Sequence, residues 1–210
     1  MSILVIDTET TGLTGHPKDR VLEIGIAELT SDGEVRPVYG EMIRYDDIVA
    51  FDAEYINEKD GEPGCWIYRH STMDINDTLN AAKDLPTVVS EVRDIVRGRV
   101  VTSYNVPFDF GRFLDREPWN LREVVTMFDD VMDLASERVY EMADADSIDD
   151  KGLQFYLLKK RDECHYPKCW VRSNEAYKAL CPDDPMKVGN QTHRALDDAL
   201  MEAHILRALL

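Results

Sequence analysis

The sequence predicts an α/β protein in which helices flank a mixed β-sheet. Short apolar runs rich in β-branched residues come first, as in residues 2–6 (SILVI) and 20–30 (RVLEIGIAELT). Later segments, such as 86–97 and 194–210, repeat apolar residues at helical spacing instead. Strands that are followed by helices interleaved with more strands favour layers of helices around one sheet.

The first three strands are expected to form an antiparallel meander. Residues 2–6 are apolar and lead directly to Asp7, which is typical of a buried central strand with a carboxylate at its end. Residues 20–30 form the second strand. The turn signal at 31–33 (SDG) then leads into a third strand over 34–44.

The segment 45–75 interrupts this pattern. Residues 58–64 (EKDGEPG) have the composition of a loop, and residues 65–69 (CWIYR) fit either a short strand or a loop that lines a site. We therefore expect an insertion here.

The sheet and helices resume after the insertion. Helices are predicted over 76–83 and 86–97, and a strand over 99–104 (RVVTSY). Pro107 suits the first turn of a helix that runs to about Asp115.

Helices dominate the C-terminal part of the chain. Residues 129–150 contain nine acidic residues and one basic residue, which predicts an amphipathic helix with an acidic outer surface that fades into a loop. Helices are expected at about 151–161 and 173–181, then a loop over 182–190. The last helix, 194–210, carries one apolar stripe: Leu196, Ala199, Leu200, Ala203, Leu206 and Leu210.

Charge and hydropathy restrict the class of protein. The 41 acidic residues against 24 basic ones give a formal net charge of -17, whereas a protein that coats duplex nucleic acid normally has a basic face. A nucleic-acid partner would therefore be touched over a few nucleotides only; the charge could also reflect a high-salt cell or a basic protein partner. No run approaches about 18 apolar residues, and the N-terminus lacks signal-peptide features, so we expect a cytoplasmic protein without a membrane span.

The four cysteines are expected to be reduced thiols. Cys164, Cys169 and Cys181, with His165, could in principle bind zinc, but the C-x4-C-x11-C spacing is not that of a zinc ribbon or finger.

Five residues that are distant in sequence suggest a divalent-metal site. Asp7 and Glu9 share one face of a strand, Asp109 ends NVPFD, and His193 and Asp198 lie in HRALDD. Four converging carboxylates repel unless cations lie between them, and Mg²⁺ prefers oxygen ligands. Two such ions about 4 Å apart can promote phosphodiester hydrolysis, with a histidine accepting the proton of the attacking water.

Each residue of this set also has a structural alternative when taken alone. Asp7 and Glu9 could be solvated turn carboxylates, and Asp198 could pair with Arg194 on the helix surface. His193 and Asp198 would diverge by about 140° on one helix, so His193 is expected in the loop before it. The co-occurrence of the motifs favours the catalytic interpretation.

The three motifs resemble those of the DEDDh 3′–5′ exonucleases, the family of the proofreading epsilon subunit of bacterial DNA polymerase III, ribonuclease T and oligoribonuclease. The resemblance covers about residues 1–205. It implies a ribonuclease H-like fold with a mixed five-stranded sheet flanked by helices, and a single exonuclease domain over 1–210 with an insertion around 45–75.

The resemblance also implies roles for the five residues. Asp7, Glu9, Asp109 and Asp198 would bind two Mg²⁺ (or Mn²⁺) ions, with Asp7 bridging both, and His193 would be the general base.

Contacts to the terminal nucleotide are implied as well. Thr10 and Thr11 would hold its 3′-OH, and Leu13 would wedge against the last base. Phe108 is a candidate stacking surface or a core aromatic, and Asn105 is a candidate substrate contact or a helix cap.

The implied function is hydrolysis at the 3′ end of single-stranded nucleic acid, DNA rather than RNA, with release of nucleoside 5′-monophosphates. A DNA polymerase or another replication or repair protein is a candidate partner. An exoribonuclease or short-oligonucleotide degrader is the alternative, followed by a non-catalytic binding module. Two segments could guide the strand or merely pack or be solvated: Trp66, Tyr68, Arg69 and His70, and the basic stretch 159–172.

Overall fold

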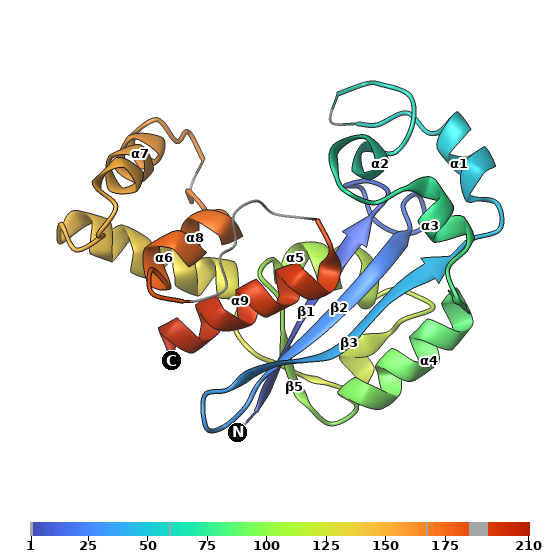
Figure 1. The fold of residues 1–210 in the computed structure, drawn as a ribbon, viewed down its shortest axis with the longest axis horizontal. Coiled ribbons are helices and arrows are strands. Elements are labelled where there is room, and N and C mark those ends of the chain that lie inside the picture. Colours follow the sequence, from blue (N-terminus) through green and yellow to red (C-terminus); the bar gives the residue numbers. More distant parts are fainter. Residues whose placement is uncertain (1, 59, 167, 185–192) are drawn as a thin grey trace.

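A computed structural model describes residues 2–58, 60–166, 168–184 and 193–210. It contains one six-stranded sheet with helices on both faces, in the order β4-β3-β2-β1-β5-β6 (Figure 1). The mixed α/β architecture is as the sequence predicts. Strands β1 (Ile3–Thr10), β2 (Val21–Leu29) and β3 (Val35–Arg44) form the predicted antiparallel meander. Strands β5 (Val100–Thr102) and β6 (Thr126–Met127) extend the sheet in parallel beyond β1.

The sheet has one strand more than the predicted five. Strand β4 (Lys83–Asp84) pairs in parallel with the end of β3. It occupies the end of the predicted helix 76–83, which is shorter and becomes α3 (Ile75–Leu79). A two-residue strand is too short to leave a hydrophobic period in the sequence, so the prediction missed it.

The segment 45–75, which the sequence predicts to be an insertion, folds as a small helical unit whose apolar cluster also includes Leu22 of β2. Helices α1 (Ile48–Glu54), α2 (Trp66–His70) and α3 lie together at one end of the sheet (Figure 1). The expectation of a strand or loop over 65–69 is therefore wrong. Five residues with two buried apolar side chains, Cys65 and Ile67, fit a strand or a helical turn equally well.

Alternating side chains of β1 supply two cores, one on each face of the sheet. Leu4 and Ile6 pack towards α4 (Leu85–Val96). Ile3 and Val5 face the cluster that contains α6 (Val131–Asp144), α8 (Ser173–Leu180) and α9 (Ala195–Leu209). Because side chains alternate along a strand, Asp7 and Glu9 continue the Ile3–Val5 row towards α9.

The remaining helices largely follow the prediction. Helix α5 (Val106–Phe108) begins with Pro107 in its first turn and continues into a π-helical turn, η1 (Asp109–Leu114), ahead of the short 3₁₀ turn η2 (Leu121–Glu123). Helix α6 is shorter than the predicted 129–150 segment, and α7 (Lys151–Asp162) follows it.

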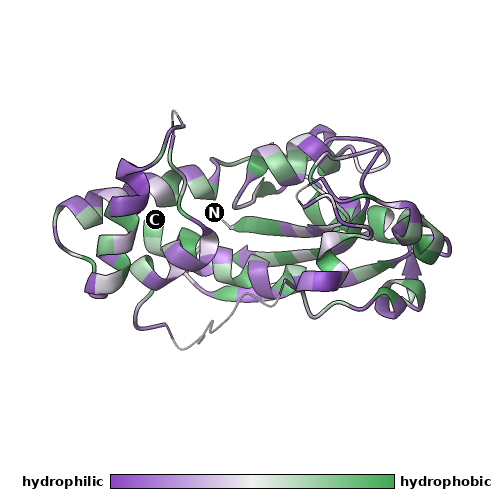
Figure 2. Cartoon of the chain, turned by 90° about the horizontal axis from the view of Figure 1, so that it is seen from above, coloured by the Kyte–Doolittle hydropathy of each residue, from purple (hydrophilic) through white to green (hydrophobic). Residues whose placement is uncertain are grey.

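Hydropathy separates the interior of the molecule from its surface. Figure 2 shows apolar residues along the strands and hydrophilic residues on much of the helical periphery. In α9, Ala199, Ala203 and Leu206 of the predicted stripe are buried, but Leu210 is exposed. Within the described ranges, no helix has both the length and the apolar character needed to cross a bilayer.

Helix α9 comes into close contact with β2 at Gly25. A Cβ atom there would lie 2.2 Å from the carbonyl carbon of Ala195 and 2.3 Å from the backbone nitrogen of Leu196. Only a residue without a side chain permits this contact, which fixes the beginning of α9 against the sheet.

Gly25→Ala should therefore destabilise the protein by about 1–3 kcal/mol, because the new methyl group must push α9 away from β2. The measurement is a thermal or urea unfolding curve. Gly111→Ala is the matched control, because a Cβ atom there meets nothing within 4 Å. Equal stability of the two variants would contradict the tight contact.

Candidate active site

The end of β1 carries the first two acidic residues of the site. Asp7 and Glu9 are two positions apart and lie on the face of the sheet that α9 covers. Glu9 is 9% exposed and Asp7 is half-buried. These carboxylates are thus held on a rigid strand rather than in a mobile turn.

Asp109 reaches the same place from the helix that follows β5. Asn105 caps this helix, because its side chain accepts a hydrogen bond from the backbone N–H of Phe108. Thr8 donates a hydrogen bond of 2.7 Å from its hydroxyl to Asp109. Asp109 is buried, so this bond orients its carboxylate beside β1. No pattern in the sequence indicates this role of Thr8.

An ion pair fixes the position of the HRALDD motif (residues 193–198). The guanidinium of Arg194 donates hydrogen bonds to Glu23 on β2, at 2.7 Å for the shortest, and the backbone N–H of Ala195 donates to the same carboxylate. Arg194 is therefore paired with Glu23 on the sheet, whereas the structural alternative expected it to pair with Asp198. This ion pair holds the beginning of α9 against the sheet.

His193 lies outside α9, in the position expected from the spacing. Its backbone has a φ of 51°, in the left-handed region, so the chain turns sharply just before the helix. Its Nδ1 is 3.9 Å from Oε1 of Glu9. The rest of the predicted 182–190 loop beyond Asp184 is outside the described residues.

The five predicted residues converge. Ligand atoms of Glu9, His193 and Asp198 all lie within 4.8 Å of one another. Burial is the main cause that raises the pKa of Asp7 well above its ordinary value, and the negative charges of Glu202, Asp109, Glu9 and Asp198 raise it further.

The other acidic groups respond in the same way. Burial, followed by the charge of Asp198, raises the pKa of Glu9, while Arg194 lowers it. Burial raises the pKa of Asp109 to about 7. Acidic groups that are buried together and repel one another fit a site for divalent cations, which would relieve both effects.

Sequence reasoning missed a fifth acidic residue, Glu202. It lies one helical turn after Asp198 on α9, is 4% exposed, and its carboxylate interacts with those of Asp109 and Asp198. A glutamate within the last helix is not a distinctive signal, because helix surfaces commonly carry such residues.

A cavity of about 180 Å³ adjoins the acidic cluster. The turn after β1 and the insertion form its walls. Ten residues line it: Thr8, Glu9, Thr10, Thr11, Gly12, Leu13, Asn57, Trp66, Ile67 and Phe108.

Four of the five predicted substrate contacts thus line this cavity: Thr10, Thr11, Leu13 and Phe108. Leu13 is 49% exposed at the cavity, whereas Thr11 is fully buried and its hydroxyl accepts a hydrogen bond from the backbone N–H of Arg20. Asn105 is not among the lining residues and acts as the helix cap described above. Their contacts with substrate remain predictions.

Two insertion residues join the site, one of which the sequence had singled out. Trp66 makes an edge-on ring contact with His193 at 5.5 Å between centroids and stacks on His70 at 4.8 Å. Asn57, which the prediction missed, is buried beside the same cavity. Arg69 pairs with Asp60.

Comparison with known proteins agrees with this geometry. A family model described as "Exonuclease" matches residues 4–165, which include the first two motifs. The chain belongs to the DEDDh 3′–5′ exonuclease family. His193 and Asp198 lie beyond the matched range, and the structure places them with the other residues of this family's motif. No curated protein sequence matches the chain.

Solved structures share the exonuclease fold. E. coli exonuclease I in complex with a dA16 oligonucleotide is 15% identical, with a TM-score of 0.57 over 99% of this chain and 40% of that one. The zinc-bound E. coli exonuclease I–single-stranded DNA complex is 16% identical, with a TM-score of 0.60 over 98% and 40%. A full-length 3′-exonuclease is 14% identical, with a TM-score of 0.52 over 98% and 59%. The chain therefore spans about two-fifths of the length of exonuclease I.

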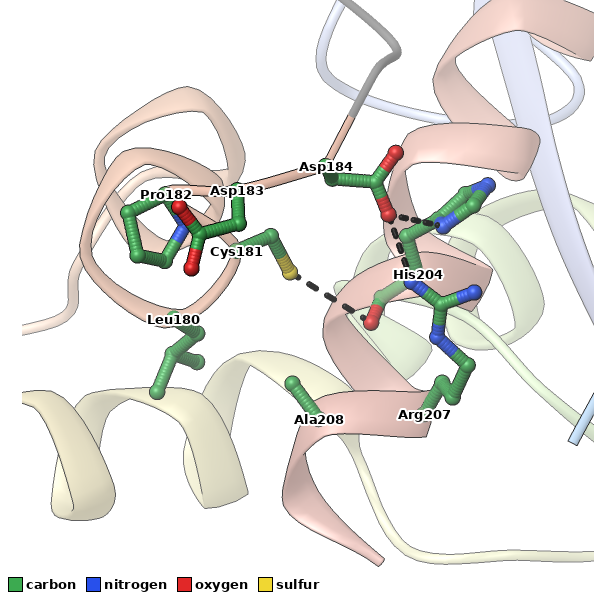
Figure 3. A pocket seen from close by; sticks show the side chains of 8 residues that line it. All are labelled: Leu180, Cys181, Pro182, Asp183, Asp184, His204, Arg207 and Ala208. Atoms are coloured by element: carbon green, nitrogen blue, oxygen red, sulfur yellow. Dashed lines mark hydrogen bonds and ion pairs between the residues drawn. The ribbon is translucent and has the colours of Figure 1, made fainter.

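A second cavity, of about 360 Å³, lies beside the later turns of α9 (Figure 3). There Asp184 accepts from Arg207 and lies 2.7 Å from Nδ1 of His204, so its charge is compensated within the protein. The thiol of Cys181 donates to the backbone carbonyl of His204. The convergent carboxylates of the exonuclease site are not among the residues that line this cavity.

Several cations of the basic stretch 159–172 form ion pairs within the protein. Lys160 pairs with Glu175, Arg161 with Asp144 and Lys168 with Asp133. Helix α7 also lies at the opposite end of the molecule from α2 (Figure 1). Among the described residues, the cysteines and His165 form no cluster with metal-ligand geometry, and all four cysteines are free thiols.

Without divalent ions, the exonuclease should lose stability as pH rises from about 5 to 8. The folded state holds protons on carboxyl groups with raised pKa values, such as Asp109 at about 7, more tightly than the unfolded chain does. Over this pH range the native state binds more protons than the unfolded chain, so the free energy of unfolding falls as the pH rises. Thermal unfolding in EDTA and in Mg²⁺ at both pH values measures this.

The stabilisation by Mg²⁺ should accordingly be larger at pH 8 than at pH 5. Asp109→Asn is the control, because it removes one of these titrations and should flatten the pH dependence in EDTA. A stability in EDTA that increases steadily from pH 5 to 8 would contradict the raised pKa values.

Trp66→Ala should lower kcat by roughly 2- to 10-fold, because His193 loses an aromatic contact of the kind that contributes about 0.5–1.5 kcal/mol. Trp66→Phe should retain most of the rate. His70→Ala is the control, since it removes the stacking partner of Trp66 and leaves the contact between Trp66 and His193 in place. Steady-state kinetics on an oligonucleotide would test this, and a Trp66→Ala enzyme with normal kcat would refute it.

Proposed function

We propose that the protein is a divalent-metal-dependent exonuclease that hydrolyses phosphodiester bonds at the 3′ end of single-stranded nucleic acid, DNA in preference to RNA. It would release nucleoside 5′-monophosphates. The observation that carries this proposal is the convergence of Asp7, Glu9, Asp109, Asp198 and His193 beside a small cavity.

Asp7, Glu9, Asp109 and Asp198 would hold two Mg²⁺ or Mn²⁺ ions. When bound, such ions lower the pKa of water and stabilise the charge on the leaving oxygen. Thr8 orients Asp109 for this task, and Glu23 and Arg194 hold the start of α9 so that Asp198 faces Glu9. His193 accepts the proton of the attacking water, which its position beside Glu9 permits.

The cavity suits a strand end. Its volume of about 180 Å³ is below the ~300–1,000 Å³ of sites for drug-sized ligands, so it suits part of one terminal nucleotide. Leu13 would press against the last base, and Phe108 and Trp66 offer aromatic surfaces that stack on any base. A small footprint also agrees with the net charge of -17, which disfavours long contacts with a polyanion.

The preference for DNA draws on the structural relatives. E. coli exonuclease I has been solved with dA16 and dT13 oligonucleotides. We extend that chemistry to this chain and infer a role in replication or repair in the cytoplasm, with a DNA polymerase or another replication protein as a candidate partner. An exoribonuclease with the same site is the competing function.

The test is digestion of 5′-labelled single strands of DNA and RNA of several lengths. In Mg²⁺ the protein should shorten DNA stepwise from the 3′ end, and EDTA should stop the reaction. His193→Ala should lose about 10²–10⁴-fold in rate, because general-base catalysis contributes that much. Asp7→Asn should lose at least as much of the digestion rate.

Asp197→Asn is the matched control for this test, because Asp197 precedes Asp198 but is exposed on α9. It should digest DNA at nearly the wild-type rate. Faster digestion of RNA than of DNA would favour the exoribonuclease, and unchanged digestion by Asp7→Asn and His193→Ala would reject the site.

A further inference from the structure

Glu202 is an acidic group at the site for which the motifs give no role. It lies on α9, four residues after Asp198, so the two side chains project from the same face of the helix. The side chain is 4% exposed, and its Oε2 atom has no hydrogen-bond partner among the described residues. A buried carboxylate oxygen without a partner is costly and calls for a specific explanation.

The surroundings of Glu202 are acidic on every side that faces the site. Asp7 and Glu9 face it from β1, Asp109 from η1 and Asp198 from its own helix. A hydrogen bond from the backbone of Tyr104 compensates the charge of Glu202 in part.

A purely structural role does not account for this arrangement. Other buried glutamates of the chain are paired: Glu23 with Arg194, Glu28 with Arg36 and Arg99, and Glu175 with Lys160. Glu202 instead adds repulsion to a cluster that already repels, which destabilises the protein unless a cation is bound.

We propose that Glu202 is a fifth carboxylate of the cation site, which raises the affinity of the protein for the divalent ions that Asp7 and Asp198 hold. This inference rests on the proposed function. Two divalent ions carry four positive charges, which four carboxylates already balance. A fifth carboxylate therefore adds net attraction, so that the site fills at a lower ion concentration. Its position one helical turn after Asp198, with a buried carboxylate oxygen that has no hydrogen-bond partner among the described residues, assigns it to the ion-facing side of α9.

The test is a binding titration of the full chain with Mn²⁺, without nucleic acid, followed by the signal of free Mn²⁺ in electron paramagnetic resonance. Glu202→Gln keeps the shape of the side chain and removes its charge. It should weaken Mn²⁺ binding by about 10–100-fold, as the loss of a group that supports metal ligands does. Asp197→Asn removes one charge from the exposed side of the same helix and should change the affinity less than about 2-fold.

Thermal unfolding gives a second readout that does not depend on catalysis. In EDTA, Glu202→Gln should melt at a temperature equal to or above that of the wild type, because one repelling charge has gone. In Mn²⁺ its melting temperature should rise less than that of the wild type. Glu202→Thr, with a smaller neutral side chain, should behave in the same way and covers the case in which the glutamine variant does not fold.

The outcomes separate this inference from the function on which it rests. If the wild type binds no Mn²⁺, the proposed function fails. If the wild type and a folded Glu202→Gln bind Mn²⁺ equally well, the function stands and the role of Glu202 is overturned. Weaker binding in Glu202→Gln but not in Asp197→Asn supports the fifth carboxylate.

Discussion

The beginning of α9 rests against β2 with almost no space between the two backbones. Gly25 allows this approach, and the Glu23 carboxylate completes it by accepting hydrogen bonds from Arg194 and from the backbone of Ala195. Everything at the site depends on this contact, because it brings residues near 195 to a strand that begins at residue 3. Without it, Asp198 would have no fixed relation to Asp7. A short, partly buried ion pair thus holds the arrangement of the acidic residues together.

The same contact has an electrostatic consequence. It brings acidic side chains from β1, η1 and α9 together in a largely buried region. Among the described groups, Arg194 lowers the pKa of Glu9, but the cluster remains net negative. Such a cluster opposes folding, since repulsion in a low-dielectric environment is strong. Proteins tolerate strain of this kind at functional sites, where binding of a ligand relieves it. If the cluster binds divalent ions as proposed, its stability and its metal affinity are linked, because the repulsion that destabilises the ion-free state also attracts the ions.

The sequence predicted those parts of the structure that have a long or chemically distinctive pattern. The β1–β2–β3 meander followed from apolar runs and an SDG turn, and the position of His193 outside α9 followed from helical geometry. Short elements such as β4 and α2 escaped, because two to five residues do not distinguish a period of 2 from one of 3.6. The hydrogen bond between Thr8 and Asp109 and the burial of Glu202 were not predicted either, because both are set by packing that no local pattern encodes.

The cavity beside the acidic cluster has walls from two parts of the chain. The turn after β1 supplies one side of the cavity, and its residues follow directly from the first motif. Asn57, Trp66 and Ile67 supply the other side from the helical unit of the 45–75 segment, which packs against Leu22 of β2 and Met42 of β3. Because Trp66 lines the cavity and contacts His193, a change in how this unit packs would alter the shape of the cavity and the orientation of the His193 ring together. The residues of the exonuclease motifs thus lie on β1, on η1 and at the beginning of α9, whereas one wall of the adjoining cavity is built by the 45–75 segment.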